Sequence, residues 1–399
     1  MLVIKNAQVF RAAGPGHKRH HQDLAAYTEK DCEILIQDGK FAKIGKGLSA
    51  SLGSDVPVFD AQSLFLMPGI VDAHSHIGGF GDSMEDQDLN EMTNPATPDL
   101  EALYSINPDS YDFDRALSAG ITSSILTPGS GNVVCGLVCA FKSQGQSLQS
   151  RCIKNPVALK MALGGNPKGV YGDRKERPMT RMGIAAVIRD CLKKGQEYLA
   201  KKALAQEGKG QAPAFDQGLE NVGRVLRREI PIKVHCEQFD MLTTLRIAEE
   251  FDILCTLDHA WGASDFYEEI CGSKHLHGVI YGPIGVPLLP GECGKIDIES
   301  LAVLDERGVT CAIMTDGPIL HPDQIVTQAG EAVRLGTPHE SVLRMITIQA
   351  AQIGLIADRV GSIEEGKDAD LCLYQGIPGL DADAHCVRTM VDGNWVYMR

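Results

Sequence analysis

The sequence predicts an α/β protein: a (β/α)8 TIM-like metallo-barrel with a small β-sandwich domain built from both ends of the chain. Three observations predict this fold. The middle of the chain alternates apolar runs with helical stretches, which is typical of parallel βαβ units. Short strand-like runs lie at both ends, outside that alternation. The length of 399 residues exceeds a single barrel of about 250 residues and leaves room for a second domain.

The two ends of the chain are expected to pair into one β domain. Their strand-like runs are 2–10, 32–37, 41–44, 370–374 and 390–397. Asp38 and Gly39 separate two of these runs and predict a hairpin turn. We therefore assign residues 1–61 and 361–399 to the small domain and residues 62–360 to the barrel.

The central part of the chain contains enough elements for a closed barrel. Its candidate strands are 70–74, 121–126, 133–141, 157–161, 232–235, 253–258, 278–281 and 310–315. Helical periodicity is clear at 182–204, 217–228, 241–250, 298–306, 324–334 and 340–354. Eight strands with intervening helices fit a closed barrel better than an open sheet.

Two features that resemble metal sites receive simpler interpretations. The segment 11–31 interrupts the strand pattern, and its His17, His20 and His21 are expected in a solvated loop, since no partner ligands surround them. The 12 cysteines form no CxxC pair, the usual zinc or redox spacing. Most lie beside apolar residues, so we expect them to act as small buried hydrophobic side chains.

Composition excludes several classes of partner. The net charge of −14 argues against nucleic acid and against anionic membrane surfaces, which attract Lys and Arg. No run of about 18 apolar residues predicts a membrane span, and the N-terminus lacks the pattern of a signal peptide. We expect a cytoplasmic protein with a small-molecule substrate, and a homo-oligomer is compatible with these features.

The stretch MPGIVDAHSH at 67–76 carries the strongest chemical signal. Side chains alternate along a strand, so His74 and His76 point the same way, about 6.5 Å apart along the chain. Two imidazoles side by side at a strand end can share one divalent ion. A pair of histidines alone is weak evidence for metal, because hydrogen-bonded histidines on one strand face give the same pattern.

Three further strand-like runs end in a side chain that can bind metal: His235, His259 and Asp316. The carboxyl ends of barrel strands meet at one mouth, where the chemistry of this fold is found. Imidazole and carboxylate ligands suit zinc foremost, and also iron, manganese, cobalt or nickel. The alternative is that His235 and His259 are hydrogen-bonded core histidines, but burying such a cluster without metal would be costly.

These motifs resemble the amidohydrolase superfamily. The resemblance rests on PGxxDxHxH at 68–76, the later histidines and aspartate at strand ends, and GSIEEGKDAD at 361–370. Within the superfamily the chain is most similar to imidazolonepropionase-related amidohydrolases. The shared sequence segments are INPDS at 106–110, PGSGN at 128–132, ALGGNPKGVYG at 162–172, TRMG at 180–183 and AIMTDGP at 312–318.

The resemblance implies a set of metal ligands. It places His74 and His76 as the ligands of the first strand, His235 and His259 as the later histidines, and Asp316 as the aspartate of the eighth strand.

Three positions leave the number of ions open between one and two. Binuclear members carboxylate a lysine of the fourth strand, and Lys160 lies in a suitable run; the alternative is a buried lysine that only snorkels or pairs with an aspartate. The subgroup usually has Glu where this chain has Gly165, and often His where it has Gly317. Both replacements remove a side chain that could support a second ion.

The function implied is metal-dependent hydrolysis of a C–N bond, an amide or cyclic amide, in a small molecule. Asp316 is expected to take a proton from the attacking water and return it to the leaving nitrogen, with His259 as the second catalytic side chain. The alternatives are a binuclear dipeptidase, which Lys160 would serve, and a non-catalytic scaffold. Such scaffolds tend to lose their ligands, whereas this chain retains five. Candidate substrate contacts are Asn132, Tyr171, Arg181 and His321.

Overall fold

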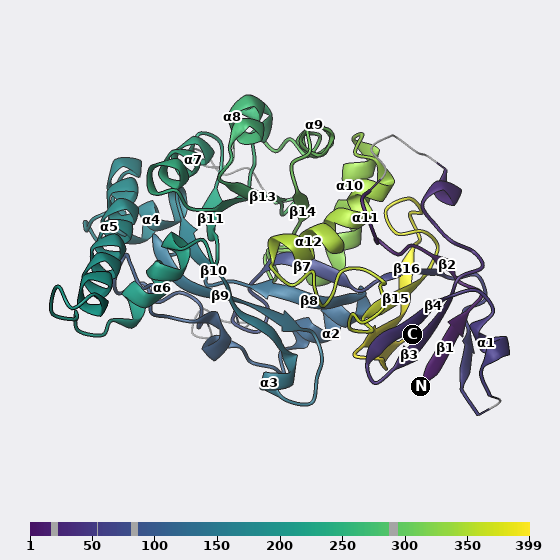
Figure 1. The fold of residues 1–399 in the computed structure, drawn as a ribbon. Coiled ribbons are helices and arrows are strands. Elements are labelled where there is room, and N and C mark those ends of the chain that lie inside the picture. The colour runs from purple at the N-terminus through teal and green to yellow at the C-terminus, as the bar shows by residue number, and fades with distance from the viewer. Residues whose placement is uncertain (17–22, 54, 81–86, 287–293) are drawn as a thin grey trace.

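The computed structural model describes residues 1–16, 23–53, 55–80, 87–286 and 294–399. An eight-stranded sheet occupies the middle of the chain, in the order β14-β13-β12-β11-β10-β9-β8-β7 (Figure 1). Its strands are β7 (Ile70–Ser75), β8 (Ile121–Leu126), β9 (Val134–Lys142), β10 (Cys152–Ala162), β11 (Ile232–Cys236), β12 (Cys255–His259), β13 (Leu276–Tyr281) and β14 (Cys311–Ile313).

The sheet curls into a nearly closed barrel. Its first and last strands meet just beyond β14, where the amide of Asp316 donates to the carbonyl of His74 at 3.1 Å. The amide of His76 donates to the carbonyl of Gly317 at 2.7 Å. The predicted α/β barrel is therefore confirmed, and this seam brings the end of β14 against the end of β7.

One strand departs from the expected parallel order, because β9 runs antiparallel to both β8 and β10. Only residues 127–133 separate β8 from β9, and residues 143–151 separate β9 from β10. A parallel connection needs about a dozen residues or more to cross over, so these short connections force the chain to reverse. The expectation of a parallel third strand was wrong for this reason.

Helices surround the barrel and extend from it. They are α2 (Tyr111–Ser118), α3 (Leu148–Arg151), α4 (Gly165–Asp173), α5 (Arg181–Gln206), α6 (Gln217–Leu226), α7 (Asp240–Phe251), α8 (Tyr267–Gly272), α9 (Ser300–Glu306), α10 (Ile325–Arg334), α11 (His339–Met345) and α12 (Ile348–Ile353). The short helix α1 (Leu48–Ser51) instead packs against N-terminal strands at residues 2–5 and 33–37. Short 3-10 turns are η1 (Leu24–Ala26), η3 (Ala102–Ser105), η4 (Ala263–Asp265) and η5 (Pro322–Gln324).

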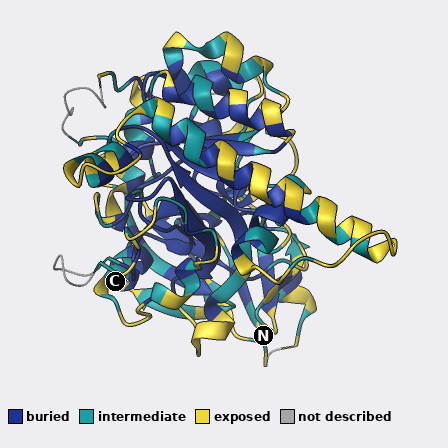
Figure 2. Cartoon of the chain, turned by 90° about the vertical axis from the view of Figure 1, so that its left-hand side faces the viewer, coloured by how far each residue is buried: buried dark blue, intermediate teal, exposed yellow. Residues whose placement is uncertain are grey.

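Polar caps explain where α5 and α6 begin. The Thr180 side chain accepts from the amide of Gly183 at the start of α5, and Asp216 accepts from that of Leu219 at the start of α6. The far end of α5 projects from the molecule and is largely exposed (Figure 2). Within the described residues, we find no helix with the length and apolar character needed to cross a membrane.

Two smaller sheets are built mainly from the chain termini, which lie in the same part of the molecule (Figure 1). The four-stranded sheet contains β1 (Leu2–Lys5), β3 (Glu33–Gln37), β4 (Lys40–Gly45) and β5 (Val58–Asp60). The five-stranded sheet contains β2 (Gln8–Val9), β6 (Phe65–Pro68), β15 (Leu371–Gln375), β16 (His385–Val391) and β17 (Asn394–Met398). Side chains from both sheets, including Ile4, Ile34 and Met390, share one apolar core, which fits a small sandwich.

The predicted hairpin turn joins β3 to β4, with φ values of 51° at Asp38 and 75° at Gly39. The boundaries of the terminal domain stay a prediction, and the antiparallel pairing of β6 with β15 adds Phe65–Pro68 to its sheets. The chain then enters the barrel at Gly69, where a Cβ atom would lie 2.1 Å from Oγ1 of Thr122. A glycine is required at this crossing.

The expectations for the histidines of segment 11–31 and for the cysteines have different outcomes. His17, His20 and His21 lie outside the described residues. Eleven cysteines are described, and all but Cys152 and Cys271 are buried with free thiols, as expected of small hydrophobic side chains.

Candidate metal centre

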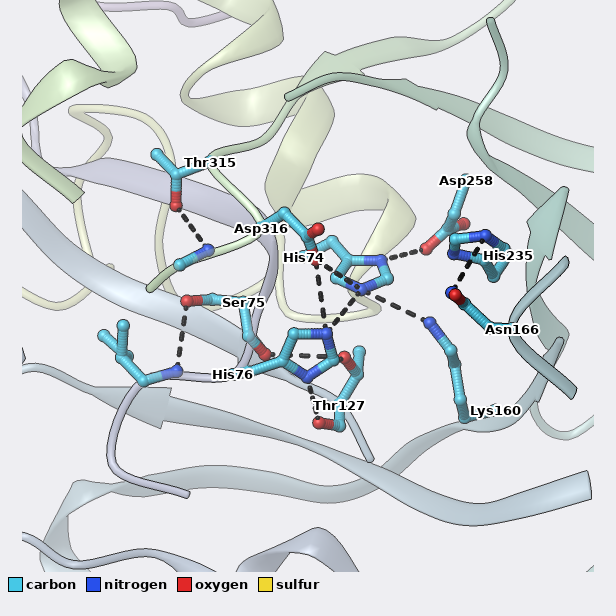
Figure 3. A network of polar contacts seen from close by, with 12 residues as sticks. His74, Ser75, His76, Thr127, Lys160, Asn166, His235, Asp258, Thr315 and Asp316 are labelled. Carbon is cyan, nitrogen blue, oxygen red and sulfur yellow. Dashed lines mark hydrogen bonds and ion pairs between the residues drawn. The ribbon is translucent and has the colours of Figure 1, made fainter. Parts of the chain in front are cut away.

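His74, at the end of β7, is fully buried at the centre of a polar network (Figure 3). Its Nδ1 lies 2.6 Å from Oδ2 of Asp258. A carboxylate oxygen only accepts, so Nδ1 carries the proton and Nε2 keeps its lone pair. Burial, followed by the charges of Lys160 and Lys233, holds the pKa of His74 well below its usual range. The ring is therefore neutral at ordinary pH, the form that binds metal.

His76 has the same tautomer for a different reason. Its Nδ1 donates to the backbone carbonyl of Thr127 at 2.8 Å, which leaves Nε2 free. The ring stacks on Phe80, with centroids 4.8 Å apart and planes at 26°. Nε2 of His76 lies 3.4 Å from Nε2 of His74 (Figure 3). Two lone pairs thus converge at the end of β7.

Asp316 follows β14 and completes this cluster. Its Oδ1 lies 3.2 Å from Nε2 of His76 and 3.5 Å from Nε2 of His74. One ligand atom from each of the three residues lies within 4.8 Å of the others. Asp316 has a φ of 56°, a left-handed conformation that residues other than glycine rarely adopt and that is often found at functional sites.

A second buried aspartate fixes the backbone that presents Asp316. Both oxygens of Asp72 accept from Thr315, one from its amide at 3.2 Å and one from its hydroxyl. Burial raises the pKa of Asp72 to about 7, and the hydrogen bonds from Thr315 oppose that rise. Asp72 shares a strand with His74, so it joins the two strands that carry the cluster.

His235 and His259 lie next to the cluster, with ring centroids 4.1 Å apart. The ring of His259 is 5.5 Å from that of His74, and both of its nitrogens are buried without a hydrogen-bond partner. Nε2 of His235 lies 3.5 Å from Nδ2 of Asn166 and 3.5 Å from Oε1 of Glu237, while its Nδ1 has no hydrogen-bond partner. Buried polar atoms without partners are costly, so these nitrogens are expected to meet a ligand.

Lys160 on β10 points into the same space. Its Nζ lies 3.3 Å from Nε2 of His74, and its side chain is fully buried (Figure 3). Burial lowers the pKa of this amine. The structure therefore brings together His74, His76, His235, His259, Asp316 and Lys160, although their roles as ligands remain a proposal.

Asp258 and Lys233 were not predicted from the sequence. Asp258 contacts Nδ1 of His74, on the side of the ring away from His76 and Asp316, and Lys233 contacts Asp258. Strand alternation predicts that Asp258 and His259 face opposite sides. The φ of 71° at His259 breaks the alternation, and both side chains lie near His74. The sequence TLDH at 256–259 contains the adjacent Asp-His pair, but no local sequence feature predicts a left-handed conformation at His259.

The candidate substrate contacts have structural partners or lie on the surface. The hydroxyl of Tyr171 donates to Oδ1 of Asn132 at 2.8 Å, and Arg181 forms an ion pair with Asp240 at 2.9 Å. His321 is exposed at the start of η5. These contacts do not assign a substrate role to any of them.

The two glycines that depart from the family pattern have different surroundings. A Cβ at Gly317 would lie 2.9 Å from Cγ2 of Ile77, so a larger side chain would require a local shift. Gly165 begins α4, directly before Asn166. Asn166 lies beside His235, and the position before it, Gly165, lacks the carboxylate expected of the subgroup.

Comparisons with known proteins agree with this geometry. Residues 294–396 match the sequence model of the Amidohydrolase family. A crystal structure of an amidohydrolase from Thermotoga maritima is 36% identical, covers 100% of both chains and superimposes with a TM-score of 0.91. Imidazolonepropionase from Caulobacter vibrioides is 22% identical over 86% of this chain and 88% of its own length. Amidohydrolase tasK from Hapsidospora irregularis is 24% identical over 90% of this chain, which spans 39% of that longer protein.

Proposed function

The chain belongs to the amidohydrolase superfamily, and from this premise we propose that it is a metal-dependent hydrolase of a C–N bond in a small molecule. The preferred substrate is an amide, and a cyclic amide foremost. One observation carries the proposal: Nε2 of His74, Nε2 of His76 and Oδ1 of Asp316 converge within 4.8 Å, and each is an atom that can bind a metal ion.

The residues present fit a divalent transition ion. Both imidazoles are held in the tautomer that leaves Nε2 free, and Oδ1 of Asp316 is buried without a hydrogen-bond partner. His235 and His259 offer further unpartnered nitrogens. This set of nitrogen and oxygen donors suits zinc foremost, with iron, manganese, cobalt or nickel as alternatives.

Protein side chains would supply the proton transfers. An ion held by these residues would supply Lewis acidity, which lowers the pKa of water toward ~7 and polarises a carbonyl. We assign Asp316 to take a proton from the attacking water and to return it to the leaving nitrogen. Its side chain is 12% exposed, whereas His74 is fully buried, so the carboxylate can reach the substrate. We assign His259 to donate a hydrogen bond to the scissile group from one of its unpartnered nitrogens.

Lys160 favours one alternative, a binuclear dipeptidase. Its amine lies 3.3 Å from Nε2 of His74, close enough for a carboxylated lysine to reach a second ion. The glycines at 165 and 317 argue for a single ion, because each lacks the family side chain that could support a second one. We therefore prefer the mononuclear amidohydrolase.

A substrate screen tests the proposed activity. Purified protein loaded with zinc is expected to hydrolyse at least one member of a panel of cyclic amides, hydantoins and dipeptides, and to lose that activity when chelator removes the metal. Turnover of dipeptides alone would favour the binuclear alternative. The proposed reaction would be contradicted by folded, metal-replete protein that hydrolyses no compound of this panel and none of an extended panel of amides.

A further inference from the structure

A buried carboxylate lies directly behind the first proposed ligand. Oδ2 of Asp258 accepts from Nδ1 of His74 at 2.6 Å, and both side chains are fully buried. The same oxygen lies 2.7 Å from Nζ of Lys233, and Oδ1 accepts from the hydroxyl of Thr256 at 2.6 Å. Contacts on both oxygens hold the carboxylate in one orientation.

Lys233 extends this support across the barrel. Its Nζ also donates to the backbone carbonyl of Ala73 at 2.9 Å, one residue before His74. Lys233 lies on β11, and β11 is not a neighbour of β7 in the sheet. The amine therefore connects the strand that carries His74 to Asp258 on β12, through the interior of the barrel.

The two imidazoles differ in the group that supports them. Nδ1 of His76 donates to a neutral carbonyl, that of Thr127. Nδ1 of His74 donates to a carboxylate, which raises the basicity of the opposite nitrogen and fixes the ring more strongly. An ion pair serving only the core would need no contact with an imidazole.

We infer that Asp258, held by Lys233, is a positioning residue that fixes His74 in the tautomer whose Nε2 faces His76 and Asp316. The inference rests on the proposed function, because it requires His74 to bind metal. Asp258 acts through His74 and contacts no substrate. A purely structural role for this carboxylate would affect stability and leave metal affinity unchanged.

Zinc affinity, measured by competition with a chromophoric chelator, tests this role without a substrate. Asp258→Asn is expected to weaken zinc binding by about 10- to 100-fold, the usual effect of removing an outer partner of a ligating histidine. Asp370→Asn is the matched control. Asp370 is also buried and accepts from a buried lysine, Lys142, at 3.1 Å, but it lies in the terminal domain. The control is expected to bind zinc as the wild type does.

A second variant allows the same test if Asp258→Asn does not fold. Lys233→Met combined with Asp258→Leu replaces the pair by apolar side chains, a change that buried ion pairs often tolerate. It is expected to weaken zinc binding to a similar extent, because Nδ1 of His74 loses its acceptor. Wild-type zinc affinity in either folded variant would overturn the inference. A wild-type protein that binds no zinc would overturn the proposed function itself, which separates the two failures.

Discussion

Asp316→Asn is expected to lower turnover by ~10²–10⁴ while the protein keeps its fold and most of its metal, since this is the usual contribution of a positioned proton carrier. The amide has the size of the carboxylate and can still offer a carbonyl oxygen to an ion. It cannot accept a proton from water near neutral pH and return it to a leaving nitrogen. Turnover of a substrate from the screen, normalised to the metal content of each sample, measures the effect.

Two other outcomes would assign Asp316 a different role. A ligand with no part in proton transfer would lose metal and activity together. A structural aspartate would behave as Asp370→Asn is expected to behave, with lower thermal stability and unchanged activity in the protein that remains folded. Wild-type turnover by metal-replete Asp316→Asn would contradict the proposed mechanism and leave the metal centre intact.

The double variant His74→Ala, His76→Ala is expected to abolish metal binding. It removes two of the three ligand atoms that converge within 4.8 Å, and Asp316 with the adjacent His235 and His259 is expected to hold an ion too weakly. Zinc is expected to raise the melting temperature of the wild type, because a ligand that binds only the folded state stabilises it, and to leave that of the variant unchanged. Elemental analysis and thermal unfolding with and without zinc measure both effects.

His385→Ala provides a control for the loss of a histidine elsewhere, since His385 lies on β16 in the terminal sheet. Its metal content and its response to zinc are expected to match those of the wild type. Stoichiometric metal in the folded double variant would mean that the ion binds outside the cluster.

Much of the fold could be predicted because its signals are local. Apolar runs separated by helical periodicity indicated the barrel strands, and Asp38-Gly39 indicated the hairpin between β3 and β4. The direction of β9 could have been inferred from the short connection 127–133, but strand periodicity contains no information about direction. Connection length, rather than pattern, determines that part of the topology.

Some residues of the candidate site could likewise be predicted from local sequence patterns, and others could not. Strand alternation placed His74 beside His76, and convergence of strand ends placed Asp316 near them, where the structure also has them. Asp258 escaped prediction because its neighbour His259 adopts a left-handed conformation, which places two consecutive side chains near one imidazole. Lys233 escaped because its contacts cross the barrel, from β11 to β7 and β12. Such contacts depend on the closed sheet and have no signature within a single strand.

The metal content of the wild-type protein, purified without chelator, tests the central claim most directly. We predict about one first-row transition ion per chain, zinc foremost, or two if Lys160 is carboxylated, from the number and type of ligands. The claim is that the cluster around His74, His76 and Asp316 binds a metal ion. A folded protein that carries no such metal, and takes up none when incubated with zinc, iron, manganese, cobalt or nickel salts, would contradict it.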